Sequence, residues 1–375
     1  MSARPIVLAA GGTGGHMFPA EALAAALMRR GLPVALVTDR RGQSFGDRLP
    51  GVALHRVRAG RIGAGVVGKV TAFAAMALGT IEASRLLRAL APAAAVGFGG
   101  YPSVPTMLAA TRMGLPTLIH EQNAILGRAN RLLAPRVRVI ATSFASVGAL
   151  KPGARARIVE TGNPVRDAVA VLRSAPYAAP ADGRIELLVI GGSQGARVLS
   201  ATVPAALALI EPALRGRLFV MQQARPEDLA EVERVHHANG IAAECAPFFE
   251  DVPNRLARAH LVIARSGAST VAELTTMGRP AILVPYRFAA DDHQTANAGA
   301  LAEAGAAWVM PEAGFTPPLL AERLTALLAA PQSLAAAAAA ARRLGRPDAA
   351  ERLADLVVAA AGLNGGAHPV REYAA

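Results

Sequence analysis

The feature that most constrains this chain is a short pattern that occurs twice, about 180 residues apart. Residues 6–10 form an apolar run of strand length that leads into a glycine-rich loop, residues 11–16, and then into a helical pattern. Residues 187–190 and the loop 191–196 repeat the same order. A strand, a glycine loop and a helix are typical of the opening unit of a parallel α/β domain. The repeat predicts two such domains, which suits a length of 375 residues.

Further apolar runs of strand length alternate with helical stretches along the rest of the chain. The runs are residues 34–38, 93–96, 117–120 and 137–142 in the first half and 217–221, 260–264 and 281–285 in the second. This alternation predicts an α/β fold with two Rossmann-like, doubly wound parallel-sheet domains. Ligands of such sheets bind at the carboxyl ends of the strands, so the polar segments after the strands are the candidate sites.

Glycine and proline interrupt the pattern at residues 161–164, and we place the domain joint there. The prediction is an N-terminal domain of residues 1–163 and a C-terminal domain of residues 164–344. The alanine run at residues 335–341 is expected to be helical. We expect a last helix, over residues 345–363, to pack back on the N-terminal domain.

The net charge of +12 is concentrated in the first half of the chain. Residues 1–163 contain 20 Lys and Arg against 6 Asp and Glu, whereas residues 164–375 contain 19 against 21. This asymmetry predicts an anionic partner for the first half, either a membrane surface or nucleic acid. Nucleic acid is disfavoured because only 4% of the residues are aromatic and none are interleaved with the basic ones. The alternative is that arginine serves here only as a solvated side chain.

The chain has a single cysteine, Cys245, which excludes a disulfide within the chain and a thiolate zinc cluster. A chain without disulfides is typical of a reducing compartment. The N-terminus leads directly into the first apolar run without the pattern of a signal peptide. We therefore expect a cytoplasmic protein.

An apolar stretch between basic residues is the candidate membrane contact. Residues 70–81 are nearly uncharged but number only about 12, short of the roughly 20 that span a bilayer, so we expect no integral membrane segment. The stretch contains Phe73 and is flanked by Lys69, Arg85 and Arg88. This composition suits shallow insertion into an anionic leaflet. A core-facing helix with solvated ends is the alternative.

Glycine loops of this kind let backbone N–H groups approach an anion at the positive end of a helix. The dinucleotide fingerprint Gly-x-Gly-x-x-Gly is incomplete, because Met17 occupies the third glycine position counted from Gly12. Asp39 after the second strand could hold a ribose, which leaves a dehydrogenase as an alternative. Neither loop has the lysine of a Walker loop.

Six motifs, in order, resemble those of the MurG-type transferase family. They are Gly-Gly-Thr-Gly-Gly-His at 11–16, Gly-Gly-Tyr-Pro-Ser at 99–103, His-Glu-Gln-Asn at 120–123, Thr-Gly-Asn-Pro-Val-Arg at 161–166, Gly-Gly-Ser-Gln-Gly-Ala at 191–196 and Arg-Ser-Gly-Ala at 265–268. The resemblance implies a GT-B arrangement of two Rossmann-like domains facing a cleft. It also implies inverting transfer of N-acetylglucosamine, without metal or cofactor, from UDP-N-acetylglucosamine (UDP-GlcNAc) to the C4 hydroxyl of the muramyl sugar of lipid I. Lipid I is the undecaprenyl-linked muramyl-pentapeptide, and the products in peptidoglycan synthesis are lipid II and UDP. The family works peripherally at the cytoplasmic face of the cell membrane.

The resemblance also implies roles for individual residues. Ser193 and its loop would meet the donor phosphates, Arg166 the nucleotide, and Glu273 the ribose. Phe249 lies where the family reads the uracil edge through the backbone. The remaining donor contacts would come from Thr13, Gly14, Gly15, Asn123, Ala268, Ser269, Thr270 and Gln294. Thr295 departs from the family pattern, because some members have a second glutamine there. The alternative for Glu273 is favourable placement near a helix N-terminus.

The transfer requires a base for the acceptor hydroxyl, and a histidine suits this task because its ordinary pKa lies near neutral pH. We predict that His16 is this base; the alternative is a helix-start residue that only hydrogen-bonds the loop. We expect His120 to tie two strand ends together. Tyr101 and Ser103 would either touch the acceptor or shape their loop. We predict no metal site, since Asp291 and Asp292 are adjacent rather than spaced as Asp-x-Asp.

Other functions stay open at this point. A related GT-B transferase or a non-hydrolysing UDP-sugar epimerase would use similar nucleotide contacts. A UDP-sugar or anionic-lipid binding protein without catalysis would keep the loops but not need the base.

Overall fold

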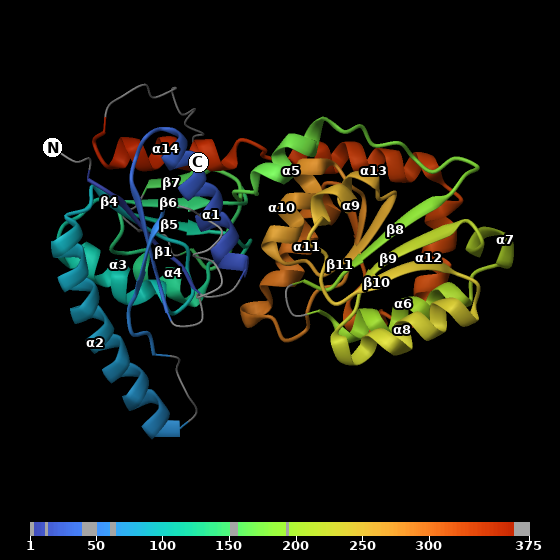
Figure 1. The fold of residues 1–375 in the computed structure, drawn as a ribbon, viewed down its shortest axis with the longest axis horizontal. Helices are drawn as coiled ribbons and strands as arrows, with labels where there is room; N and C mark the ends of the chain where they lie inside the picture. Colours follow the sequence, from blue (N-terminus) through green and yellow to red (C-terminus); the bar gives the residue numbers. More distant parts are fainter. Residues whose placement is uncertain are drawn as a thin grey trace. The chain divides into compact units, whose positions relative to one another are not determined.

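The computed structural model describes residues 4–11, 14–39, 51–60, 65–150, 157–192 and 195–363, except for the side chains of residues 66, 67 and 69. The chain forms two compact units (Figure 1). Unit 1 comprises Met1–Arg166 together with Asp348–Ala375, and unit 2 comprises Asp167–Pro347.

Unit 1 is a seven-stranded parallel sheet in the order β3-β2-β1-β4-β5-β6-β7. Its strands are β1 (Ile6–Ala9), β2 (Val34–Thr38), β3 (Ala53–Arg56), β4 (Ala94–Gly97), β5 (Thr117–Glu121), β6 (Val139–Thr142) and β7 (Arg157–Glu160). Its helices are α1 (Gly14–Arg29), α2 (Gly65–Leu90), α3 (Ser103–Arg112), α4 (Arg128–Leu133) and α14 (Ala349–Ala360). The strand order reverses between β1 and β4, which is where such sheets bind ligands.

Unit 2 is a six-stranded parallel sheet in the order β10-β9-β8-β11-β12-β13. Its strands are β8 (Ile185–Ile190), β9 (Leu218–Gln223), β10 (Ala242–Ala246), β11 (Leu261–Ala264), β12 (Ala281–Leu283) and β13 (Ala307–Val309). Its α-helices are α5 (Asp167–Val171), α6 (Arg197–Ala208), α7 (Pro212–Arg215), α8 (Pro226–Ala238), α9 (Val252–Arg258), α10 (Ala268–Met277), α11 (His293–Glu303), α12 (Pro317–Leu328) and α13 (Pro331–Leu344). Short 3-10 turns are η2 (Leu172–Ser174), η3 (Ala290–Asp292) and η4 (Glu312–Gly314).

These sheets confirm the prediction of two Rossmann-like, doubly wound parallel domains. The alanine run lies inside α13, as predicted. In unit 2 the strand order reverses between β8 and β11, so the second glycine loop also lies at a switch point.

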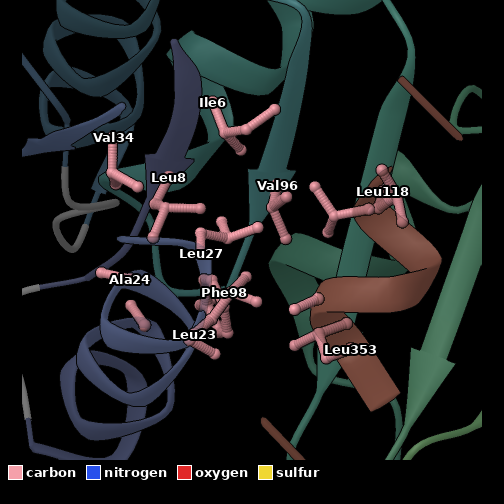
Figure 2. Close-up of a cluster of buried hydrophobic side chains, with 14 of the residues drawn as sticks. Ile6, Leu8, Leu23, Ala24, Leu27, Val34, Val96, Phe98, Leu118 and Leu353 are labelled. Carbon is pink, nitrogen blue, oxygen red and sulfur yellow. The ribbon is translucent and has the colours of Figure 1, made fainter. Parts of the chain in front are cut away.

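The core of unit 1 explains why its central strands are apolar on both faces. On one face, Leu8 and Val96 pack with Leu23 of α1 and Leu353 of α14 (Figure 2). On the other face, Ile119 and its neighbours pack with residues of α2 and α3. Helix α14 thus fills part of the core of unit 1 although it follows all of unit 2 in the sequence.

Ion pairs at the surface join α14 to α1. Arg30 bonds Glu351 at 2.5 Å and Asp355 at 2.6 Å, and Arg29 bonds Glu351 at 2.8 Å. Such exposed pairs contribute little alone, so the apolar contacts provide most of the stabilisation of this packing.

Helix α2 is longer than the apolar stretch predicted at residues 70–81. It packs on α3, and its buried residues include Ala72, Ala83 and Leu87. By length and composition, Val70–Leu90 would suffice to cross a membrane, and the bent pair Pro317–Leu328 with Pro331–Ala360 passes the same test. Core helices of soluble proteins pass it too, and α12 contributes Leu320 and Leu324 to the core of unit 2.

Candidate active site

The loops that follow β1 and β4 meet closely at the switch point of unit 1. The Gly11 N–H donates to the Gly99 carbonyl over 3.1 Å, and a Cβ on Gly11 would lie 3.2 Å from Gly100 Cα. Gly99 and Gly100 both have positive φ, +83° and +73°, which a side chain disfavours. Glycine is therefore required for the two loops to touch.

His16 lies on the first turn of α1, with its ring against this glycine contact. A Cβ on Gly99 would lie 3.3 Å from His16 Cε1, and one on Gly100 would lie 3.2 Å from His16 Cδ2. The ring nitrogen Nδ1 is 3.3 Å from Gln122 Oε1, just after β5. Three elements of the sheet edge thus position this half-buried imidazole.

Gln122 and His120 are buried side by side behind His16. Gln122 Nε2 bonds the carbonyl of Phe98 at 3.0 Å and lies 3.2 Å from both His120 Nδ1 and the His120 carbonyl. His120 Nε2 lies 3.0 Å from the Gly162 carbonyl, in the segment after β7, which confirms that His120 ties strand ends together. Burial lowers the pKa of His120 to about 4, so this ring is neutral at neutral pH.

Glu121 holds the neighbouring segment in place. Its buried carboxylate accepts from the backbone N–H of Asn123 at 3.0 Å, from Asn123 Nδ2 at 3.2 Å, from the Gly127 N–H at 2.8 Å and from Asn130 Nδ2 at 2.9 Å. These bonds compensate for the desolvation of the carboxylate. They also fix the orientation of the Asn123 amide, because a flipped amide would place its oxygen against the Glu121 carboxylate and lose the bond from Nδ2.

Two residues predicted to lie near the acceptor substrate follow β4: Tyr101 is on the loop, and Ser103 is the first residue of α3. Ser103 is fully buried, and its hydroxyl donates to the Gly100 carbonyl over 2.9 Å. Its side chain therefore shapes the loop, whereas Tyr101 is partly exposed.

Three further residues predicted to bind the donor substrate lie on α1 or against it, and a fourth lies outside the described residues. Gly14 and Gly15 begin α1 beside His16, and Thr13 lies outside the described residues. The Arg166 guanidinium lies over the Phe18 ring of α1, 5.1 Å from its centre. The structure thus assigns Arg166 to unit 1.

The switch point of unit 2 is organised by Gln223, at the end of β9. Its Oε1 accepts from the Gly191 N–H over 3.1 Å, and its Nε2 donates to the carbonyls of Gly192 at 3.1 Å and Pro247 at 3.2 Å. The side chain thereby fixes the start of the second glycine loop. Ser193, predicted to meet phosphate, lies outside the described residues.

The segment after β11 presents the start of α10 at the same sheet edge. Arg265 is buried and bonds Glu312 at 2.5 Å and the carbonyls of Val284 and Pro285. Ser266 is also buried, and its hydroxyl donates to the Gln294 carbonyl over 2.7 Å. These bonds fix the approach to the N-terminus of α10.

The N-terminus of α10 carries residues of unit 2 that were predicted to contact the donor substrate. Its N-cap residue is Gly267, with no capping side chain. Ser269 carries a buried hydroxyl oxygen that has no hydrogen-bond partner among the described residues. A helix N-terminus with an unbonded hydroxyl suits a phosphate group. The other predicted contacts on this helix are buried Ala268 and partly buried Thr270 and Glu273.

Gln294 and Phe249, two more residues of unit 2 predicted to contact the donor substrate, are held by neighbouring residues. Gln294 Oε1 accepts from the Tyr286 N–H over 3.0 Å. Thr295, the position at which some family members have a second glutamine, donates its hydroxyl to Asp292 over 2.7 Å. Phe249 is buried, and the Arg255 guanidinium lies 3.9 Å from the centre of its ring.

Sequence reasoning named His16, Asn123 and Gln294 but gave no role to Glu121, Gln122 or Gln223. The first two lie inside a quoted motif, and Gln223 lies two residues after the predicted strand 217–221, so position was the only available signal. Among the residues that the structure describes, no three His, Cys, Asp or Glu side chains gather as metal ligands would.

The comparisons with known proteins cover both units. The glycosyltransferase family 28 N-terminal domain model matches residues 6–142, and the family 28 C-terminal domain model matches residues 186–353. The chain is 57% identical over 367 residues to the UDP-N-acetylglucosamine–N-acetylmuramyl-(pentapeptide) pyrophosphoryl-undecaprenol N-acetylglucosamine transferase of Rhodospirillum centenum, with 98% of this chain and 97% of that protein covered.

Solved structures agree with these matches. The crystal structure of Acinetobacter baumannii MurG superposes with a TM-score of 0.76 at 30% identity and covers 94% of this chain and 99% of its own. A putative UDP-N-acetylglucosamine 2-epimerase from Listeria monocytogenes has a TM-score of 0.66 at 16% identity, with 96% of each chain covered. The second likeness shows a shared fold alone.

Proposed function

Because this chain belongs to the MurG family of UDP-N-acetylglucosamine-dependent transferases, we propose that it transfers N-acetylglucosamine from UDP-GlcNAc to lipid I in peptidoglycan synthesis. The observation that carries the proposal is the pair of switch-point sites. Unit 1 presents a positioned histidine, and unit 2 presents an uncapped helix start with an unbonded hydroxyl.

The reaction is a displacement at the anomeric carbon of the donor sugar. The C4 hydroxyl oxygen of the muramyl sugar forms the new bond to that carbon as the bond to UDP breaks, which inverts its configuration. His16 takes the hydroxyl proton, and UDP leaves with the electron pair of the broken bond. Asn123 and Gln294 contact the donor sugar, and Glu273 binds the ribose.

The leaving diphosphate needs stabilisation as its charge develops. The N–H groups at the start of α10, the Ser269 hydroxyl and the glycine loop with Ser193 supply hydrogen-bond donors for it, and Arg166 supplies positive charge. Preorganised donors of this kind perform the task that a metal ion performs in other transferases. The proposal is therefore a metal-independent transferase.

Transfer of labelled N-acetylglucosamine to a lipid-linked muramyl-pentapeptide, with and without a chelator, tests this proposal. We expect lipid II and UDP at equal rates in both samples. Loss of transfer in the chelator would contradict metal independence. Binding of UDP-GlcNAc without any transfer would favour a binding protein, and conversion of the free UDP-sugar would favour an epimerase.

We also propose that unit 1 binds the cytoplasmic face of the cell membrane through α2. Side chains spaced three and four residues apart on this helix form an exposed stripe: Val70 at 62%, Phe73 at 77%, Ala74, Ala77, Leu78 and Ile81. Arg85 and Arg88 are exposed on the same helix, and the Lys69 side chain lies outside those described. An apolar stripe that continues into basic residues suits a helix lying in an anionic leaflet.

Sedimentation with anionic vesicles tests this contact. Val70→Ser with Phe73→Ser should weaken binding, because each change removes exposed apolar surface from the bilayer. The matched control is Val171→Ser, since Val171 is a similarly exposed valine, at 73%, on unit 2. Added salt should release the protein. Vesicle binding that does not change with added salt would contradict an electrostatic contribution. An equal loss of vesicle binding in Val171→Ser would contradict the assignment of the contact to α2.

A further inference from the structure

A series of hydrogen bonds runs along the carboxyl edge of the unit 1 sheet. The donor and the acceptor of each bond can be assigned in turn, starting from one end of the series. The series begins at the Gly162 carbonyl, which can only accept a hydrogen bond. His120 Nε2, 3.0 Å away, must therefore carry a hydrogen. His120 is completely buried and its pKa is lowered to about 4, so the ring is neutral and its Nδ1 must be an acceptor.

The next assignment is the orientation of the Gln122 amide. His120 Nδ1, an acceptor, faces Gln122 at 3.2 Å, and the carbonyls of Phe98 and His120 face the same atom at 3.0 and 3.2 Å. Three acceptors around one atom identify it as the amide nitrogen. The amide oxygen of Gln122 must therefore be the atom that faces His16.

The last step reaches His16. An amide oxygen can only accept, so His16 Nδ1, 3.3 Å from Gln122 Oε1, must carry the hydrogen of this contact. In a neutral ring the basic lone pair then lies on Nε2. A Cβ on Gly99 would lie 3.3 Å from His16 Cε1 and one on Gly100 would lie 3.2 Å from His16 Cδ2, so the glycines leave the ring the room that it occupies.

We propose that Gln122, oriented by His120, is a positioning residue that holds His16 in the Nδ1–H tautomer and so presents Nε2 as the base. This inference rests on the proposed function, because it assumes that His16 takes the acceptor proton. An amide differs here from the carboxylate that orients histidine in hydrolase triads. It fixes the tautomer without placing a negative charge beside the ring.

A nitrogen NMR measurement on the unmodified protein tests the tautomer without any reference to activity. The two ring nitrogens of a neutral histidine have distinct shifts according to which carries hydrogen. The His16 signals are assigned by their loss in His16→Gln, since the chain has 8 histidines. In mildly alkaline buffer we expect the Nδ1–H form, and a dominant Nε2–H form would overturn the proposal.

Gln122→Met then tests whether this glutamine is the cause. Methionine is similar in length but offers no comparable acceptor, so His16 should populate both tautomers. The kcat should fall by about 10- to 100-fold, the range seen for residues that orient metal-binding histidines, with little change in the KM for UDP-GlcNAc. An unchanged tautomer, or a changed tautomer with unchanged kcat, would overturn the proposal.

Unit 2 offers a matched control. Gln222 Oε1 lies 2.9 Å from His236 Nε2, and both residues are buried, but neither belongs to the candidate site. Gln222→Met should change the His236 signals and leave kcat unchanged. If kcat falls as much in this variant as in Gln122→Met, both losses reflect general destabilisation of the fold, and the proposal is overturned.

The outcomes separate this proposal from the one it rests on. If His16→Gln keeps full turnover, His16 is not the base, whatever its tautomer. If His16→Gln abolishes turnover and the ring is in the Nε2–H form, the base assignment stands and the role of Gln122 fails. Should Gln122→Met not fold, the spectrum of the unmodified protein decides alone.

Discussion

At the scale of single residues, two buried histidines make the stability of the fold depend on pH. Burial lowers the pKa of His120 and of His236 to about 4, from an ordinary value of 6.5. The unfolded chain therefore binds more protons than the folded chain between these two values. Stability should be complete above pH 6.5 and should fall as the pH drops toward 4, by up to roughly 3 kcal/mol for each ring.

Urea unfolding across this pH range checks the prediction. His120→Gln and His236→Gln should each flatten the loss of stability toward acid, whatever they do to stability at neutral pH. A slope that is the same in both variants and the parent protein would show that these rings do not cause it.

The same scale shows what the sequence could and could not predict of the site. His16 and Asn123 stand out because of their residue types and motif positions. Their supports, Gln122 and Glu121, are neighbours of His120 in one segment, and the contact that each makes depends on the loops after β4 and before α4. That placement is set by tertiary structure, so residue spacing alone did not reveal it.

At the scale of elements, the strands that sequence patterns missed are β3, β7, β10 and β13. All four lie at the edges of their sheets. Central strands such as β1 are buried on both faces and read as continuous apolar runs, whereas β3, β7 and β10 contain exposed residues. Strand patterns were therefore predictable where burial is complete and not where one side of the strand meets solvent.

Helix α2 is fixed by a close backbone approach that can be tested. A Cβ on Gly79 would overlap the Arg58 carbonyl, in the segment after β3. Gly79→Ala should therefore destabilise the fold by about 1 to 3 kcal/mol in urea unfolding. The control is Gly299→Ala in α11, where no atom lies within 4 Å of the new Cβ. Because alanine favours helix over glycine, the control should stabilise by roughly 0.5 to 1 kcal/mol. Equal effects would contradict the packing argument.

At the scale of the whole molecule, the chain ends in the unit where it begins. Leu353 of α14 is fully buried with Leu8 and Leu23, so Leu353→Ala should cost unit 1 about 2 to 5 kcal/mol. Hydrogen exchange should accelerate in β1 and α1 and stay unchanged in β8 and β11. Leu324→Ala, a fully buried leucine of unit 2, should give the reverse pattern. Acceleration across both units in either variant would contradict two separately packed cores.

The central claim is a transferase whose base is His16, and one variant tests it most directly. His16→Ala is measured for UDP-GlcNAc binding and for transfer of labelled N-acetylglucosamine to lipid I on the same preparation. The account predicts donor binding close to that of the parent protein and turnover lower by about 10²- to 10⁴-fold, the usual contribution of a general base. Turnover equal to that of the parent protein would contradict the account.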